Sequence, residues 1–129
     1  MVEVTIYRTF SFDCSHRLTR VPSDHKCARL HGHTYRLTVY VSGPPDERGF
    51  CGGADYSEIK TGVLRVLAHI DHYHLNDVDV RLSNPTTEAL AEYLWPRLKA
   101  ELPGLCRIRL SESAETGCIY SGPRAGSRI

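Results

Sequence analysis

A cysteine and two histidines within seven residues form the stretch of this sequence best suited to chemistry. His31 and His33 are separated by one glycine, and Cys27 lies four residues before His31. On a β-strand, residues i and i+2 point to the same face about 6.6 Å apart, so both imidazoles could bind one metal ion. Because such a pair often occurs by chance, it predicts a metal site only if another ligand lies nearby.

His16 is the candidate third ligand. Residues 2–16 alternate between apolar and polar side chains, which predicts a strand with His16 on its apolar face. If this strand pairs with the one that begins near His31, three imidazoles converge and leave one position of a tetrahedral zinc ion open, as in catalytic sites. Iron or another first-row metal could use the same nitrogens. The alternative is that His16 is a hydrogen-bonded histidine of the core.

Cys27 lies in a long polar loop, residues 18–30, between these two strands. The adjacent Lys26 and a nearby metal ion would both lower the pKa of its thiol, which makes Cys27 a candidate thiolate base. Alternatively, Cys27 is the fourth ligand of a closed, structural zinc site.

Two further acidic positions are candidates for proton transfer or ligand binding. Asp71 precedes His72 at the expected end of a helix, where a carboxylate can hold an imidazole tautomer and the pair can move a proton. A surface helix terminus is the alternative interpretation. Glu112 shares the apolar face of Ile108 and Leu110, where a carboxylate needs a partner. A ligand with adjacent N–H donors would bind Glu112 through two parallel hydrogen bonds.

The periodicity predicts the elements that position these side chains. Alternation indicates strands at 2–16, 33–42, 106–112 and 118–121, and helical spacing indicates helices at 55–71 and after Thr87. Pro96 should kink the second helix or end its regular part. The order ββααββ predicts an α+β domain with a four-stranded antiparallel sheet and both helices on one face. Its open edges favour oligomerisation.

Length and composition narrow the class of protein. The 129 residues fit a single domain, 1–129, in which about 122–129 form a loose tail. The chain is 41% hydrophobic and 24% charged with a net charge of +1, which implies no general attraction to nucleic acid or membranes. No segment resembles a signal peptide or a membrane span, so we expect a cytoplasmic protein. Five cysteines without a CxxC pair indicate free thiols.

Six motifs, in this order, resemble those of the 6-pyruvoyl-tetrahydropterin synthase family. Within it, the chain is most similar to the bacterial 6-carboxy-5,6,7,8-tetrahydropterin synthase branch, which feeds queuosine biosynthesis. The motifs are FDCSHRL (12–18), HKCARLHGH (25–33), ADYSEIK (54–60), IDHYHLND (70–77), NPTTE (84–88) and SESAETGCIY (111–120).

The resemblance implies a role for each candidate residue. The zinc ligands would be His16, His31 and His33. Cys27 would be the catalytic base, Asp71 and His72 its proton-relay partners, Glu112 the anchor of the pterin ring, and Thr86 and Thr87 part of the lining of that pocket. Lys26 and Arg29, with Arg17, are candidates to contact a triphosphate. Adjacency to Asp71 favours His72 over His74 as the histidine that carries the proton.

The resemblance also implies an assembly and a reaction. The family has the tunnelling fold, in which trimers close their sheets into a barrel, often stack as hexamers, and place active sites at subunit interfaces. The implied substrate is 7,8-dihydroneopterin triphosphate, and the products are 6-carboxy-5,6,7,8-tetrahydropterin, acetaldehyde and triphosphate. Two alternatives stay open: a 6-pyruvoyl-tetrahydropterin synthase that eliminates triphosphate, and a non-catalytic, zinc-stabilised pterin-binding protein.

Overall fold

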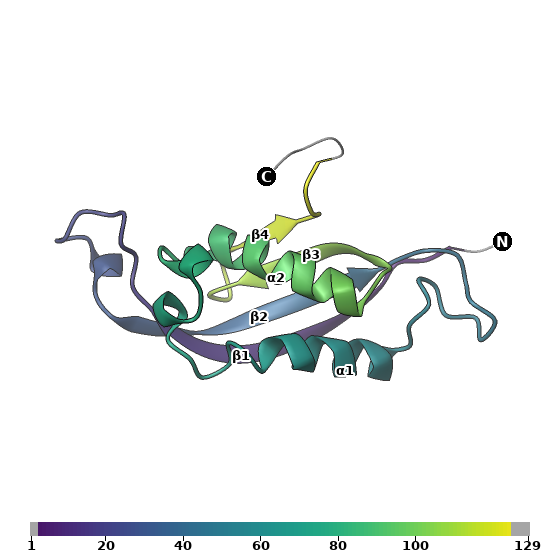
Figure 1. Ribbon diagram of the computed structural model, residues 1–129. Helices are drawn as coiled ribbons and strands as arrows, with labels where there is room; N and C mark the ends of the chain where they lie inside the picture. The colour runs from purple at the N-terminus through teal and green to yellow at the C-terminus, as the bar shows by residue number, and fades with distance from the viewer. Residues whose placement is uncertain (1–2, 125–129) are drawn as a thin grey trace.

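The structure, a computed structural model, describes residues 3–124 and contains one antiparallel sheet with two helices (Figure 1). The strands β1 (Ile6–His16), β2 (His31–Val41), β3 (Leu105–Ser111) and β4 (Gly117–Tyr120) are neighbours in the order β1-β2-β3-β4. The helices α1 (Tyr56–Leu67) and α2 (Thr87–Glu101) lie between β2 and β3 in the chain. The predicted order ββααββ is therefore confirmed, with short 3-10 turns added in the connections.

The long β1–β2 hairpin carries the alternation that the sequence shows. Its register runs from Ile6 opposite Val41 to His16 opposite His31. The prediction that the first strand starts at residue 2 is wrong by several residues. Because β2 ends at Val41, residues 3–5 have no strand partner; Val4 is 50% exposed, and its amide donates to Cys51 Sγ at 3.5 Å.

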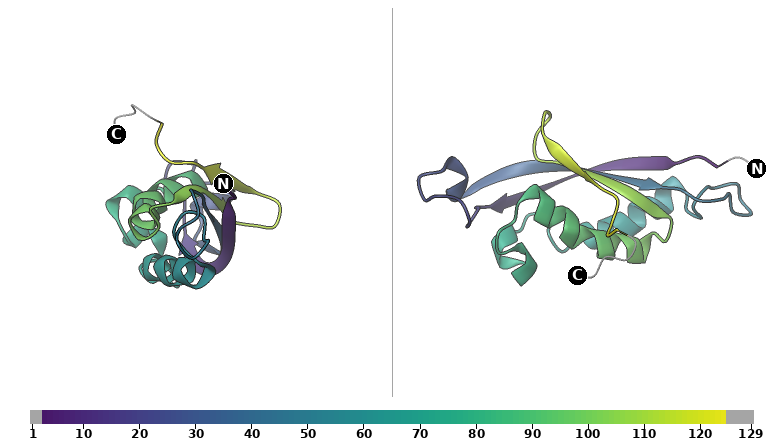
Figure 2. Two further views of the ribbon diagram at one scale, coloured as in Figure 1. Left: turned by 90° about the vertical axis from the view of Figure 1, so that its right-hand side faces the viewer. Right: turned by 90° about the horizontal axis from the view of Figure 1, so that it is seen from above.

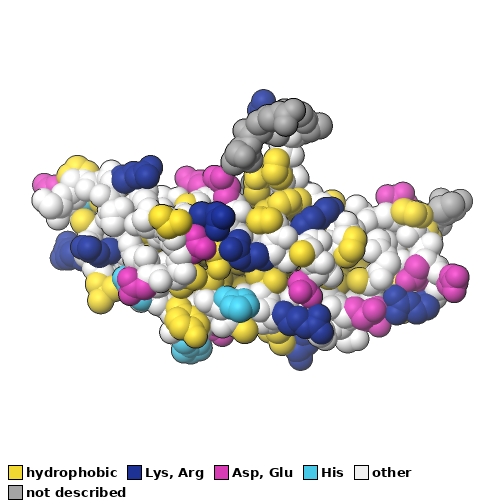
Figure 3. All heavy atoms as spheres, viewed as in Figure 1, with side chains coloured by type: hydrophobic (Ala, Val, Ile, Leu, Met, Phe, Trp, Pro, Cys, Tyr) yellow, Lys and Arg dark blue, Asp and Glu magenta, His cyan; other side chains and the backbone are white. Residues whose placement is uncertain are grey.

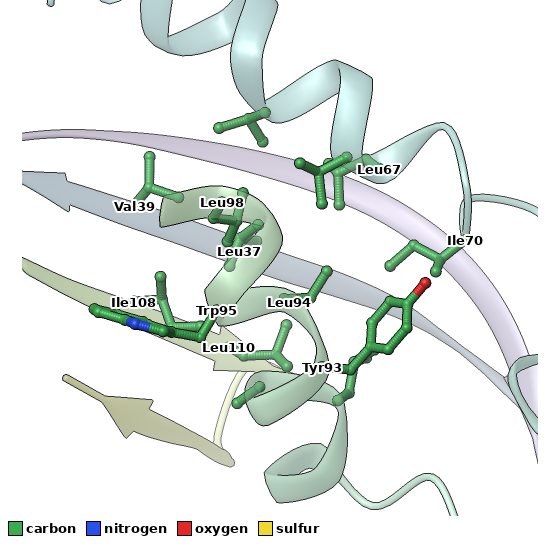
Figure 4. Close-up of a cluster of buried hydrophobic side chains, with 14 of the residues drawn as sticks. Leu37, Val39, Leu67, Ile70, Tyr93, Leu94, Trp95, Leu98, Ile108 and Leu110 are labelled. Atoms are coloured by element: carbon green, nitrogen blue, oxygen red, sulfur yellow. The ribbon is translucent and has the colours of Figure 1, made fainter. Parts of the chain in front are cut away.

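Both helices pack on the same face of the sheet, as the end-on and top views show (Figure 2). The core lies between them and the inward-facing strand residues (Figure 4). Leu37 and Ile108 from the sheet and Leu94 and Leu98 from α2 are completely buried. Burial of such side chains contributes about 1.5–3 kcal/mol each, which fixes the sheet against the helices and holds the strand ends in place.

Helix α1 begins with a capping box. The Asp55 carboxylate accepts a hydrogen bond from the Glu58 amide, and the Glu58 carboxylate accepts one from the Asp55 amide. The regular helix ends at Leu67 rather than near Asp71. Ile70 lies in the following turns and is still completely buried, which explains why its apolar side chain extended the predicted helix to residue 71.

The prediction that Pro96 ends the regular part of the second helix is wrong, because α2 continues to Glu101. A proline inside a helix removes one amide donor and typically costs about 3 kcal/mol. Its neighbours Leu94, Trp95 and Leu98 are all buried in the core. We attribute the continuation of the helix to this packing.

The candidate residues of the β1–β2 hairpin gather at one end of the molecule. Residues 17–30 project there beyond the helices, at the left of Figure 1. At the other end of the chain, Gly122 lies against Trp95, so that a Cβ atom placed on it would be 2.6 Å from the ring. Of the predicted tail, residues 125–129 lie outside the described residues. Within the described part, no helix is long and apolar enough to cross a membrane.

Candidate active site

Three imidazoles converge where β1 ends and β2 begins. His16 and His31 are cross-strand partners, and their Nε2 atoms lie 3.1 Å apart. His33 follows on the same face, with its ring centre 5.0 Å from those of both other histidines. One nitrogen from each residue lies within 4.8 Å of the other two. The arrangement thus provides three converging donors for one metal ion.

Backbone carbonyls determine which ring nitrogens are available. The Nδ1 atom of His16 lies 2.8 Å from the Pro85 carbonyl oxygen, and that of His31 lies 2.7 Å from the Arg29 carbonyl oxygen. Because a carbonyl only accepts, each Nδ1 must carry the donating hydrogen. In the neutral rings both Nε2 lone pairs then face each other across 3.1 Å. A cation between them removes this repulsion, so the residues fit a bound metal.

Burial favours the metal-binding form of His16, whose residue surface is 1% exposed. Loss of solvation lowers the pKa of His16, and the neighbouring His31 and His33 act in the same direction. The Pro85 carbonyl and Glu112 oppose this shift. The neutral imidazole is the form that binds metals.

Glu112 lies directly beside this cluster. Its Oε2 atom is 3.1 Å from Nε2 of His33, and its Oε1 atom accepts a hydrogen bond from the Thr87 hydroxyl. The contact with His33 lacks hydrogen-bond geometry, so the buried His33 Nε2 has no hydrogen-bond partner among the described residues. This nitrogen is a second sign that the site is built for a ligand outside the chain. The carboxylate and the histidines therefore form one site.

Cys27 lies on a separate short turn, Lys26–Ala28, and is half-buried. The Nδ1 atom of His25 accepts a hydrogen bond of 3.0 Å from the Cys27 amide, and the Cys27 carbonyl accepts one of 2.8 Å from Leu18. Two groups of described residues could hold a metal, the three histidines and Asp13 with Asp71 and His72, and neither includes Cys27. This favours the open site over the closed one with Cys27 as fourth ligand.

The Asp71–His72 pair forms as the sequence suggests. Oδ1 of Asp71 accepts hydrogen bonds from Nδ1 of His72 at 2.9 Å and from the Asp13 amide at 3.0 Å. His72 has a left-handed backbone with φ of 67°, and its amide donates to the Asp13 carbonyl at 2.6 Å. His74 instead contacts the Ser15 hydroxyl at 2.9 Å. His72 is thus the partner of Asp71, and its unusual backbone is held by β1.

The candidate residues form separate groups within one chain. No described hydrogen bond or ion pair joins the Cys27 thiol or the Asp71–His72 pair to the histidine cluster, although His33 and His72 line the same shallow hollow. Thr86 caps α2 by accepting from the Ala89 amide. Lys26 and Arg29 are exposed on the projecting loop. One chain alone therefore does not bring the whole predicted set into contact.

Contributions of four residues to the site were missed by the sequence reasoning. They are the Pro85 and Arg29 carbonyls, the His25 cap on the Cys27 turn, and the main chain of Asp13, which binds both members of the Asp71–His72 pair. Backbone contacts between distant segments leave no mark on residue type. Only His25 had a detectable signal, because it stands two residues before Cys27 and can cap a turn.

Cys14 lies near the same groups but is unsuited to act as a base. Burial raises its pKa to about 12, and the Asp71 and Asp13 carboxylates add to the shift. At pH 8 we therefore expect a thiol reagent to modify Cys14 only after unfolding, which peptide mass spectrometry would measure. Labelling in the folded protein as fast as in urea would contradict this assignment.

Comparison with known proteins decides the family. The sequence pattern described as 6-pyruvoyl tetrahydropterin synthase matches residues 5–123. The chain belongs to this family. It is 36% identical to the 6-carboxy-5,6,7,8-tetrahydropterin synthase of Synechocystis sp., over 92% of this chain and 94% of that protein.

Two other members extend the comparison. The dihydroneopterin monophosphate aldolase of Pyrococcus furiosus is also 36% identical, over 87% of this chain and 91% of its own. The structure of 6-pyruvoyl tetrahydropterin synthase from Caenorhabditis elegans superposes with a TM-score of 0.84 at 27% identity, covering 95% and 98% of the two chains. The family resemblance and the tunnelling fold expected from the sequence are thus confirmed, whereas the named members do not all share one reaction.

Proposed function

We propose that this protein is a zinc-dependent carbon–carbon lyase that converts 7,8-dihydroneopterin triphosphate and one water molecule to 6-carboxy-5,6,7,8-tetrahydropterin, acetaldehyde and triphosphate, in queuosine biosynthesis. The observation that carries the proposal is the cluster of His16, His31 and His33 beside Glu112. It joins a metal-binding group to a carboxylate suited to a pterin ring within one site. The Synechocystis relative supports the choice of reaction.

The residues around the cluster would bind and orient the substrate. The Glu112 carboxylate would accept two parallel N–H bonds from the pterin edge, since each oxygen has a second lone pair beyond its present contacts. Thr87 already donates to Oε1 and so fixes the orientation of the carboxylate. Lys26 and Arg29, exposed on the projecting loop, would contact the triphosphate.

The proton transfers are assigned to the two remaining groups. A zinc ion held by the three histidines would act as a Lewis acid that acidifies a C–H bond of the substrate side chain. The Cys27 thiolate would take that proton. His72, oriented by Asp71 at 2.9 Å, would return a proton to the side chain. Its side chain is 76% exposed in the single chain and therefore accessible to a substrate.

We further propose that the complete site lies at a subunit interface. β1 and β4 are the edge strands of the sheet, so their outer backbone groups can pair with another copy. A trimer or hexamer that joins these edges could bring the Asp71–His72 pair of one copy to the Cys27 turn of another. This assembly would account for the separation of the candidate groups within one chain.

One other reaction has specific support. The Pyrococcus furiosus relative is as similar in identity as the Synechocystis one, and its name is that of an aldolase for a monophosphate. A retro-aldol cleavage would use the same base and the same pterin anchor. The exposed Lys26 and Arg29 offer two cations, which suit a triphosphate better than a monophosphate.

Product analysis distinguishes these reactions. The zinc-loaded protein is incubated with 7,8-dihydroneopterin triphosphate or with the monophosphate, and the products are separated by chromatography with mass detection. The proposed lyase releases acetaldehyde and triphosphate from the triphosphate. Triphosphate without acetaldehyde would identify the 6-pyruvoyl activity, whereas a phosphorylated aldehyde from the monophosphate would identify the aldolase. Binding without any product would indicate a pterin-binding protein.

The His25 cap gives a prediction specific to the Cys27 turn. His25→Ala removes the acceptor for the Cys27 amide, and loss of a cap costs about 0.5–2 kcal/mol. We expect turnover to fall by about 2- to 30-fold. His25→Asn, which can still cap, should retain most activity, and His69→Ala, an exposed histidine, is the control. Equal activities and equal Cys27 alkylation rates in the Ala and Asn variants would contradict this role.

A further inference from the structure

A hollow on the face of the sheet opposite the helices has an unusual lining. It is formed by Thr9, Arg36, Thr38, Arg109, Ser111, Ser113 and Ala114. Two guanidinium groups and four hydroxyl groups therefore line it, and no carboxylate does. The Thr9 and Thr38 hydroxyls bond to each other at 2.8 Å, so only one of their two hydrogens can point to a ligand. That hydrogen and the guanidinium donors make the hollow suited to an anion.

The two arginines are placed close together by the strand register. Arg36 is opposite Ser111 and Thr38 is opposite Arg109, so the arginines are diagonal neighbours on β2 and β3. Diagonal positions on one sheet face are about 7–8 Å apart, within reach of long side chains. Like charges at this spacing repel. Arg107, two residues before Arg109 on the same face, adds a third cation.

Neither arginine is neutralised by a neighbour in the described part of the chain. Ion pairs there join Arg48, Arg65, Arg81 and Arg97 to carboxylates, but none includes Arg36 or Arg109. On the side seen in Figure 3, basic and acidic side chains are interspersed.

Two acidic residues near the hollow, Asp13 and Glu115, do not neutralise these arginines. On the face of the hollow, Asp13 accepts a hydrogen bond from Thr34. Glu115 lies in the β3–β4 loop, beside a neighbouring hollow that Arg109 also lines. Neither carboxylate forms a described ion pair with Arg36 or Arg109.

We propose that this hollow is a second anion site, which binds a polyphosphate. Guanidinium groups bind phosphate oxygens through paired, charge-assisted hydrogen bonds, and the flanking hydroxyls can donate to the remaining oxygens. Several linked phosphates match two or three adjacent cations better than one phosphate does. The site is distinct from the histidine cluster, because the histidines lie on the helix-covered face of β2 and Arg36 lies on the other. It does not depend on the proposed reaction.

Titration calorimetry of the full chain with inorganic triphosphate tests this site. Arg36→Gln/Arg109→Gln removes the proposed contacts. Lys26→Gln/Arg29→Gln removes the cations assigned to the active site, and Arg65→Gln/Arg81→Gln is a control that removes the same charge elsewhere. We expect a binding event that weakens at least about tenfold in the first variant and persists in the other two. Inorganic phosphate should bind this hollow more weakly than triphosphate does.

Two results would overturn the proposal. One is triphosphate binding to Arg36→Gln/Arg109→Gln that equals binding to the charge-matched control. The other is the loss of all binding in Lys26→Gln/Arg29→Gln, which would place the only triphosphate site on the projecting loop. Because the measurement detects binding rather than turnover, failure of the proposed lyase activity would not affect it.

Discussion

Replacing Cys27 with alanine is expected to lower turnover of 7,8-dihydroneopterin triphosphate by about 10²- to 10⁴-fold, the usual contribution of a general base. The metal content should not change, because the proposed ligands are His16, His31 and His33, and Cys27 belongs to no group of described residues able to hold a metal. Pterin affinity should also be retained, because it is assigned to Glu112. Steady-state kinetics, metal analysis and equilibrium binding on the same preparation would measure all three quantities.

A matched variant separates the chemistry of this thiol from general effects of losing a cysteine. Cys106 is also a half-buried free thiol, but it lies on β3 and donates to the Tyr40 carbonyl at 3.4 Å. Cys106→Ala should keep nearly full activity. If Cys27→Ala retained wild-type turnover, Cys27 would be excluded as the base. If it lost the metal, the closed site with Cys27 as a ligand would be supported.

Replacing His31 with alanine is expected to weaken zinc binding by more than about 100-fold. Loss of a residue that only supports a metal ligand weakens binding by up to about 100-fold, and His31 is itself a proposed ligand. The change also leaves Nε2 of His16 without its neighbour at 3.1 Å. Turnover should fall with metal occupancy. Competition with a chromogenic chelator would measure the affinity of the purified variant.

His69 provides the control for this experiment, because it is an exposed histidine outside the cluster. His69→Ala should bind zinc as the wild type does. Equal zinc affinity of His31→Ala and the wild type would contradict the assignment of the three-histidine cluster as the metal site.

The sequence was informative wherever local pattern and tertiary structure agree. Strict alternation located the β1–β2 hairpin, and continuing that alternation placed His16 on the same face as His31 and His33. The structure shows His16 and His31 as direct cross-strand partners. The position of Glu112 at the end of an apolar face likewise anticipated its place beside His33.

The remaining features depend on packing between distant segments, which no local pattern records. Pro96 was expected to kink α2 or end its regular part, but the helix continues to Glu101 with buried neighbours on both sides of the proline. Contacts with β1 determine whether His72 or His74 pairs with Asp71. The Ser15 hydroxyl contacts His74, whereas the Asp13 amide donates a hydrogen bond to Asp71. The separation of Cys27 from the histidines could not be predicted either, because it reflects the path of the long loop.

The stoichiometry of the products tests the central claim most directly. Zinc-loaded wild-type protein should release acetaldehyde and triphosphate in equal amounts from 7,8-dihydroneopterin triphosphate, with an equal amount of 6-carboxy-5,6,7,8-tetrahydropterin, and Cys27→Ala should release almost none. Triphosphate release without acetaldehyde, at a rate that Cys27→Ala leaves unchanged, would contradict both the proposed reaction and the proposed base.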